Sequence, residues 1–140
     1  MRKIIVTGSE SVIGKAIMEG LWWFVDDYEI IGLDKKNGQD VLDNLELIAT
    51  ADILINNAYI PVDQNALFMA WCKTNKDKAK LCVNISSQIA SAEDPSKFAT
   101  EQYYIDKKYM DEQSVEINKN HWKCKVCLLY TSPSPRDPTK

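Results

Sequence analysis

Short apolar runs alternate with segments of helical periodicity along most of the chain. The first run, Lys3–Thr7, is rich in isoleucine and valine, and apolar residues then recur at helical spacing from Ile13 to Phe24. The other predicted strands are Glu29–Leu33, a short Asp40–Leu42, Asp52–Asn56, Lys80–Ser86 and Lys123–Tyr130. The other predicted helices are Leu42–Thr50, Ala66–Asn75 and Ser96–Lys119. This alternation predicts a parallel sheet in a doubly wound α/β fold with right-handed crossovers.

Length and composition predict one domain, formed by residues 1–130. A chain of 140 residues can build one sizeable core. Residues 131–140 hold three of the five prolines and no apolar pattern, so we expect a disordered Ser/Pro tail. A net charge of −3 argues against nucleic acid or an anionic membrane as a partner. No apolar run approaches the roughly 20 residues of a membrane span, and a cytoplasmic protein is expected.

The four cysteines do not predict a disulfide framework or a metal site. A chain able to build its own core does not require disulfides, so reduced thiols are expected. Cys124 and Cys127 have the spacing of half a zinc site, but they lie in the last predicted strand. A three-residue offset in a strand directs their sulfur atoms to opposite faces.

A turn bracketed by Gly8 and Gly14 joins the first predicted strand to the first helix. Backbone N–H groups and the helix dipole can hold a pyrophosphate in such a turn. Asp34 ends the second predicted strand, where a carboxylate can accept both ribose hydroxyls of an adenosine and repel a 2′-phosphate. The prediction is therefore NAD rather than NADP, although Lys35 and Lys36 could instead attract a phosphate.

Tyr103 and Lys107 stand four residues apart in the long predicted helix, and so do Tyr104 and Lys108. A four-residue offset places both side chains on one face, where an ammonium beside a phenol favours the ionised phenol. A phenol with a pKa of about 10 then becomes a usable acid or base near neutral pH. Ser87 follows the strand that precedes this helix.

The order of these motifs resembles that of the short-chain dehydrogenase/reductase family over nearly the whole chain. The matching segments are Thr7-Gly8-Ser9-Glu10-Ser11-Val12-Ile13-Gly14, Asn56-Asn57-Ala58, Val83-Asn84-Ile85-Ser86-Ser87 and Tyr103-x-x-x-Lys107. The resemblance implies a Rossmann-like sheet and an NAD(P)-dependent oxidoreductase that transfers hydride between nicotinamide and an alcohol or carbonyl substrate. It also leaves a homo-oligomer open.

The resemblance assigns the catalytic roles. Tyr103 would be the acid/base, Lys107 would lower its pKa and hold the nicotinamide ribose, and Ser87 would orient the carbonyl and stabilise the oxyanion. Asn65 falls where the family has an asparagine that anchors a proton-relay water, and it could equally cap a helix. We prefer Tyr103 over Tyr104 because Ile105 and Met110 then fall where the family's helix is apolar.

The resemblance also assigns cofactor contacts. Gly8, Ser11, Ile13 and Gly14 would form the pyrophosphate turn, with Ser11 or Val12 in place of the family's third glycine. Asp40 and Val41 resemble the adenine-contacting pair, and Asn56, Asn57 and Ala58 would brace the sheet beside the cofactor. Tyr59 stands where glycine is usual and would narrow that space.

A second class of function stays open at this point. Family members are normally much longer and continue past the last predicted strand, so the sheet is expected to be incomplete at its C-terminal edge. The chain would then be a non-catalytic nucleotide-binding remnant, or an incomplete gene fragment of such an enzyme. The substrate and the direction of the reaction do not follow from the sequence.

Overall fold

The structure is a computed structural model that describes residues 1–91 and 100–131. Residues 92–99 and 132–140 lie outside the described residues. The described residues therefore leave out the first residues of the predicted helix Ser96–Lys119 and nearly all of the predicted tail 131–140. Thr131, assigned to the tail, is the last residue of a strand.

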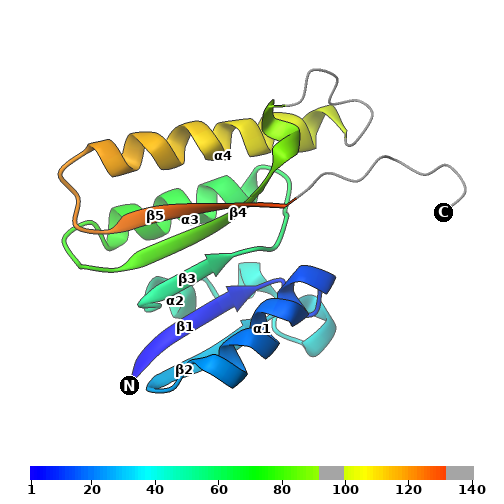
Figure 1. Cartoon of the computed structure of the whole chain (residues 1–140), viewed down its shortest axis with the longest axis vertical. Coiled ribbons are helices and arrows are strands. Elements are labelled where there is room, and N and C mark those ends of the chain that lie inside the picture. The colour runs from blue at the N-terminus through cyan, green and yellow to red at the C-terminus, as the bar shows by residue number, and fades with distance from the viewer. Residues whose placement is uncertain (92–99, 132–140) are drawn as a thin grey trace, which may run out of the picture.

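Five strands form one parallel sheet, which confirms the predicted α/β fold (Figure 1). Their spatial order is β2-β1-β3-β4-β5, and every neighbouring pair is parallel. The strands are β1 (Arg2–Thr7), β2 (Tyr28–Leu33), β3 (Ile53–Asn56), β4 (Leu81–Ser87) and β5 (Lys125–Thr131). Because β1 lies between β2 and β3, the chain leaves β1 in one direction and later returns to its other side. Ligands of open α/β sheets bind at such a reversal, outside the carboxyl ends of the strands.

Within the described residues, four α-helices connect these strands, and three short 3-10 helices occupy loops. The α-helices are α1 (Val12–Phe24), α2 (Leu45–Ala49), α3 (Asp63–Thr74) and α4 (Glu101–Lys119). The 3-10 helices are η1 (Lys35–Asn37), η2 (Val41–Asp43) and η3 (Gln88–Ser91). No helix within residues 1–91 and 100–131 is long and apolar enough to cross a membrane.

The predicted short strand Asp40–Leu42 is wrong. Asp40 instead caps η2, and its carboxylate accepts a hydrogen bond of 3.0 Å from the backbone N–H of Leu42. An aspartate that binds the backbone two residues ahead favours a turn over an extended strand. The helix predicted from Ala66 also begins earlier, at Asp63.

Both faces of the sheet are buried at its central strands β1, β3 and β4, which explains why β1 and β3 are almost continuously apolar. Ile5 and Leu54 point to one face and pack with residues of α3 and α4, including Phe68 and Met110. On the other face, a second cluster contains Ile4, Val6, Ile55, Val83 and Ile85, with residues of α1 packed against it. The two layers fix the positions of the loops at the carboxyl ends of β1, β3 and β4.

Candidate functional site

The turn between β1 and α1 has no room for side chains at its two glycines. Gly8 has a φ of +68°, in the left-handed region that favours glycine. A Cβ atom added to Gly14 would lie 1.9 Å from the carbonyl oxygen of Gly8. The first turn of α1 therefore packs directly on the backbone of the glycine turn, as a close-fitting anion cradle requires.

Ser11 takes part in this turn through its side chain. Its hydroxyl donates to the Gly8 carbonyl at 2.8 Å and accepts from the N–H of Gly14 at 3.0 Å, which caps α1. The side-chain amide of Asn57 donates both to Gly8 O and to Ser11 Oγ at 3.1 Å. Val12 is 88% exposed and takes no part in these contacts. A serine in this position holds the turn closed and satisfies one N–H of the first helical turn.

Asp34 lies at the carboxyl end of β2, within reach of the glycine turn as predicted. Its carboxylate accepts hydrogen bonds of 3.0 Å from the backbone N–H groups of Lys36 and Glu10. The N–H of Lys36 is the main cause that lowers the pKa of Asp34, and partial burial opposes it. The carboxylate is therefore ionised at neutral pH, with lone pairs left for further donors.

The two residues that resemble an adenine-contacting pair lie just beyond this carboxylate. Val41 is 4% exposed and belongs to the core, whereas Asp40 forms an exposed ion pair of 3.8 Å with Lys35. Lys35 is thus paired with Asp40 at the surface. These contacts leave the predicted adenine role of Asp40 and Val41 as a prediction.

The asparagines that end β3 link the glycine turn to the helices on the other side. Thr7 Oγ1 accepts from the backbone N–H groups of Asn57 and Ala58, both at 3.0 Å. Asn56 is fully buried and donates to Asn84 on β4 at 2.9 Å and to the backbone carbonyl of Gln64 at 3.2 Å. Buried amides require such partners, so Asn56 and Asn57 fix the positions of β1, β3 and α3 relative to one another.

Tyr103 and Ser87 meet at the carboxyl end of β4. The Ser87 side chain acts on the Tyr103 phenol as a hydrogen-bonding group and lowers its pKa, so the two side chains lie next to each other. Ser86, the preceding residue, donates instead to Asp111 at 2.6 Å. The ring of Tyr104 lies beside Lys108, with the ammonium 5.8 Å from its centroid. Of the two tyrosines, the structure thus brings Tyr103 to Ser87.

Lys107 lies beneath Tyr103 and is closed off from solvent. It is 2% exposed, and its Nζ donates to Gln64 Oε1 at 2.9 Å and to the Ile85 carbonyl at 2.8 Å. The same nitrogen lies 5.4 Å from the ring centroid of Tyr103. Burial lowers the pKa of Lys107 to about 8, and the carboxylates of Asp111 and Asp106 offset part of this effect.

The pKa of Tyr103 moves in the direction opposite to the one that we expected from Lys107. Burial raises this pKa above its ordinary value, and the hydrogen bond with Ser87 lowers it only in part. The ammonium faces the ring of Tyr103 and is occupied by Gln64 and Ile85. Tyr103 is consequently a protonated phenol at neutral pH in this arrangement.

Three residues of the site did not stand out in the sequence as ligands: Tyr59, Gln64 and Asp106. Gln64 bridges the site, because its amide donates to the Asn56 carbonyl at 3.0 Å while its oxygen accepts from Lys107. Asp106 is 6% exposed and accepts from the Tyr59 hydroxyl at 2.7 Å. The sequence shows an aspartate directly before Lys107, but it does not show that both side chains are buried.

Asn65 does not cap α3, because it is the third residue of that helix. Its side-chain amide donates to the backbone carbonyl of Asp106 at 2.8 Å, and its Oδ1 is buried without a partner among the described residues. The residue thus ties α3 to α4 beside Lys107. Its role as a water anchor stays a prediction.

The burial of Lys107 gives a testable dependence of stability on pH. Because the folded-state pKa is about 8 and the ordinary value is 10.5, the unfolded chain binds more protons between these values. The free energy of unfolding of the wild type, measured relative to Lys107→Met, should therefore rise by about 2 kcal/mol between pH 7 and pH 10.

Urea unfolding of both proteins across this range measures the difference directly. Loss of the contacts to Gln64 and Ile85 also destabilises Lys107→Met, but that loss does not depend on pH and leaves the slope unchanged. A difference in the free energy of unfolding that stays constant, or that falls as the pH rises, would show that burial does not lower the pKa of Lys107.

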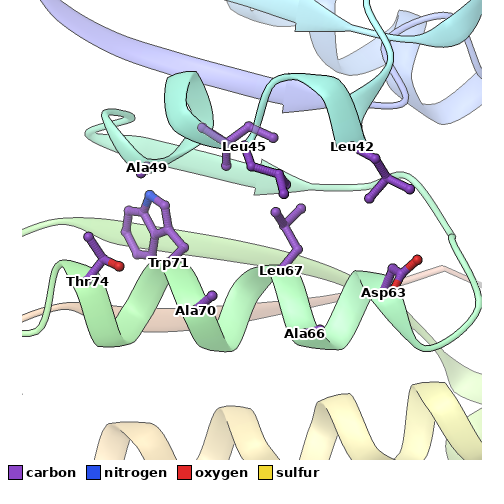
Figure 2. A pocket seen from close by; sticks show the side chains of 10 residues that line it. Leu42, Leu45, Ala49, Asp63, Ala66, Leu67, Ala70, Trp71 and Thr74 are labelled. Atoms are coloured by element: carbon purple, nitrogen blue, oxygen red, sulfur yellow. The ribbon is translucent and has the colours of Figure 1, made fainter.

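An apolar groove of about 360 Å³ lies elsewhere, between α2 and α3 (Figure 2). Leu67 and Trp71 of α3 extend toward Leu45 and Ala49 across it. Among the described residues that line it, Asp63 is the one that carries a charge. None of the candidate catalytic or cofactor-binding residues lines this groove, so it adds nothing to the site around Tyr103 and Lys107.

Known structures share this fold. An oxidoreductase (short chain dehydrogenase/reductase) from Brucella ovis superposes with a TM-score of 0.69 at 18% identity, over 99% of this chain and 85% of that one. A GDP-L-fucose synthetase from Naegleria fowleri bound to NADP gives 0.67 at 13% identity, over 94% of this chain and 50% of that one. MoeE5 in complex with UDP-glucose and NAD gives 0.64 at 12% identity, over 91% and 53%.

No protein-family model matches the sequence, and no curated protein matches it. The chain has the Rossmann-like fold of short-chain dehydrogenase/reductase structures, with the strand order β2-β1-β3-β4-β5. At these identities the likeness shows the fold. The chain spans 85% of the first similar structure and about half of the two others.

Proposed function

We propose that the chain binds a nicotinamide dinucleotide and interconverts an alcohol and a carbonyl compound. The observation that carries this proposal is that the Tyr103 phenol lies next to the Ser87 side chain, with Lys107 one helical turn further along α4. Gln64 and Asn56 connect this group by hydrogen bonds to the strand end beside the glycine turn. An acid, an oxyanion donor and an anion cradle thus share one edge of the sheet.

The residues at this edge fit the cofactor. The absence of room for a Cβ atom at Gly14 and the left-handed backbone of Gly8 are what a pyrophosphate cradle needs. Asp34 would accept the ribose hydroxyls, and Lys107 would hold the nicotinamide ribose. When bound, the reduced cofactor would supply the hydride.

The side chains of this chain would handle the proton. Ser87 would donate a hydrogen bond to the substrate oxygen, and Tyr103 would transfer its proton to that oxygen as the carbonyl carbon is reduced. The resulting phenolate would take a proton back from solvent. The raised pKa keeps Tyr103 protonated at neutral pH, which is the form that carbonyl reduction requires.

Titration with NADH tests whether the chain binds the cofactor. The chain contains four tryptophans, which act as energy donors to bound NADH. Saturable quenching of their emission, with matching sensitised emission from NADH, is the expected result. A signal that stays linear up to millimolar NADH would contradict the proposal.

The ionised carboxylate of Asp34 predicts a preference for NADH over NADPH. A 2′-phosphate would meet this carboxylate as a like charge, and we expect its dissociation constant to be about tenfold higher. Asp34→Asn is the matched control, because it keeps an acceptor and removes the charge, and it should bring the two constants within about threefold. Tighter binding of NADPH by the wild type would point to Lys36 as a phosphate ligand.

A non-catalytic nucleotide-binding protein is the second candidate. The burial of Lys107 favours it, because a lysine that is 2% exposed does not meet a ligand without rearrangement. Binding of NADH without turnover of any alcohol or carbonyl compound would support this candidate over the enzyme.

A further inference from the structure

Among the described residues, two acceptors bind the ammonium of Lys107, which leaves one of its donors for a ligand. An ammonium carries three donors, and two of them are used by Gln64 Oε1 and the Ile85 carbonyl. The rings of Tyr59 and Tyr103 cover the ammonium elsewhere, with centroids 5.5 and 5.4 Å from Nζ. A ligand hydroxyl that accepts a hydrogen bond from Lys107 must therefore compete with these two aromatic contacts.

Tyr59 is held in this position by a buried carboxylate. Its hydroxyl donates to Asp106 Oδ2 at 2.7 Å, and the backbone N–H of Val62 donates to the same oxygen at 3.2 Å. Gln102 donates to the other oxygen of Asp106 at 2.9 Å. The Tyr59 ring also packs edge-on against Tyr103, with centroids 4.7 Å apart. Three hydrogen bonds to one buried carboxyl group thus hold this arrangement in place.

Of the two rings, Tyr59 is the one that can move away. Tyr103 belongs to α4 and lies next to Ser87, whereas Tyr59 lies in the connection between β3 and α3. That connection ends at Val62, whose φ of +65° is unfavourable for a β-branched residue. Its conformation is thus sustained by contacts such as those to Asp106, and losing them allows it to relax.

We propose that Tyr59 sets the affinity of this site for nicotinamide dinucleotides. While its hydroxyl is bonded to Asp106, the Tyr59 ring lies against the Lys107 ammonium. The ribose must displace this ring to reach the ammonium. This inference rests on the proposed function, because it takes the nicotinamide ribose as the ligand of Lys107. A smaller residue at position 59 then leaves that side of the ammonium open.

The test is NADH titration of the wild type, Tyr59→Gly, Tyr59→Ala and Tyr59→Phe. Removal of the ring in Tyr59→Gly or Tyr59→Ala should lower the dissociation constant by about tenfold or more. Tyr59→Phe keeps the ring and removes the hydrogen bond to Asp106, so the dissociation constant of this variant for NADH should fall by about threefold. Tyr104→Phe, whose ring lies beside Lys108, serves as the matched control and should bind as the wild type does.

The outcomes separate this inference from the proposed function. If all four variants bind NADH with the wild-type constant, or if Tyr59→Gly and Tyr59→Ala bind more weakly while folded by circular dichroism, the role of Tyr59 is wrong and the proposed function stands. If neither the wild type nor any folded variant binds NADH, the proposed function is wrong, and the role of Tyr59 is wrong with it. Should the two small variants not fold, Tyr59→Phe decides, and an unchanged or higher constant overturns the inference.

Discussion

Replacement of Tyr103 by phenylalanine is expected to abolish turnover of an alcohol or carbonyl substrate, with a loss on the order of 10³-fold or more. The phenol lies next to Ser87 and can exchange a proton with a substrate oxygen at this edge of the sheet. Phenylalanine keeps the ring contacts with Tyr59 and Lys107. NADH binding and the free energy of unfolding should therefore change little.

Two further variants test whether the loss of activity is specific to Tyr103. Lys107→Met should remove nearly all activity and also weaken NADH binding, because it deletes the donor proposed for the ribose. Tyr104→Phe should keep most of the activity, since neighbouring residues on a helix diverge by about 100° and Tyr104 pairs with Lys108. Steady-state rates with a panel of carbonyl substrates and NADH measure all three. Equal losses in Tyr103→Phe and Tyr104→Phe, or full activity in Tyr103→Phe, would exclude Tyr103 as the acid.

The fold was predictable because its determinants are local and repeated. Apolar runs buried on both faces, such as those of β1 and β3, need helices above and below them, and the sequence supplies those helices at regular intervals. The error at Asp40–Leu42 arose where a short apolar run was too brief to set its own structure. There the hydrogen bond from Leu42 N–H to the Asp40 side chain determined the conformation.

The candidate site was predictable where a motif has a fixed backbone requirement. Gly8 and Gly14 are examples, since no other residue fits their turn. The choice of Tyr103 over Tyr104 agrees with the geometry, but its stated reason was half wrong. Met110 is fully buried, whereas Ile105 is 49% exposed and Asp106 takes the inward position beside Lys107.

The burial of Asp106 could not be read from the sequence because it depends on distant partners. Its carboxylate is satisfied by Tyr59 and Val62, which are more than 40 positions away along the chain. A charged residue enters a protein interior only where such donors are available. Gln64 is a similar case, because its bridge between Asn56 and Lys107 exists only after β3, α3 and α4 have assembled.

Gly14→Ala is expected to have a large effect on stability, with a loss of about 3 kcal/mol in the free energy of unfolding. The added Cβ would lie 1.9 Å from the Gly8 carbonyl oxygen, and both of the atoms in conflict are attached to fixed backbone. Relief requires α1 to move away from the turn. Such a shift would break the contact between Gly14 N–H and Ser11 Oγ and would disturb the bonds of Asn57 to Gly8 and Ser11.

Gly20→Ala, in the same helix, is the matched control for that loss. A Cβ atom at Gly20 meets no atom within 4 Å, so alanine should raise the free energy of unfolding by about 0.5–1 kcal/mol through its higher helix propensity. Urea unfolding followed by circular dichroism measures both variants. Because the cradle would be displaced, Gly14→Ala should also lose NADH binding under conditions where it stays folded, while Gly20→Ala should keep it. A Gly14→Ala protein as stable as the wild type would mean that the first turn of α1 does not pack on Gly8, and the pyrophosphate cradle would have to be abandoned with it.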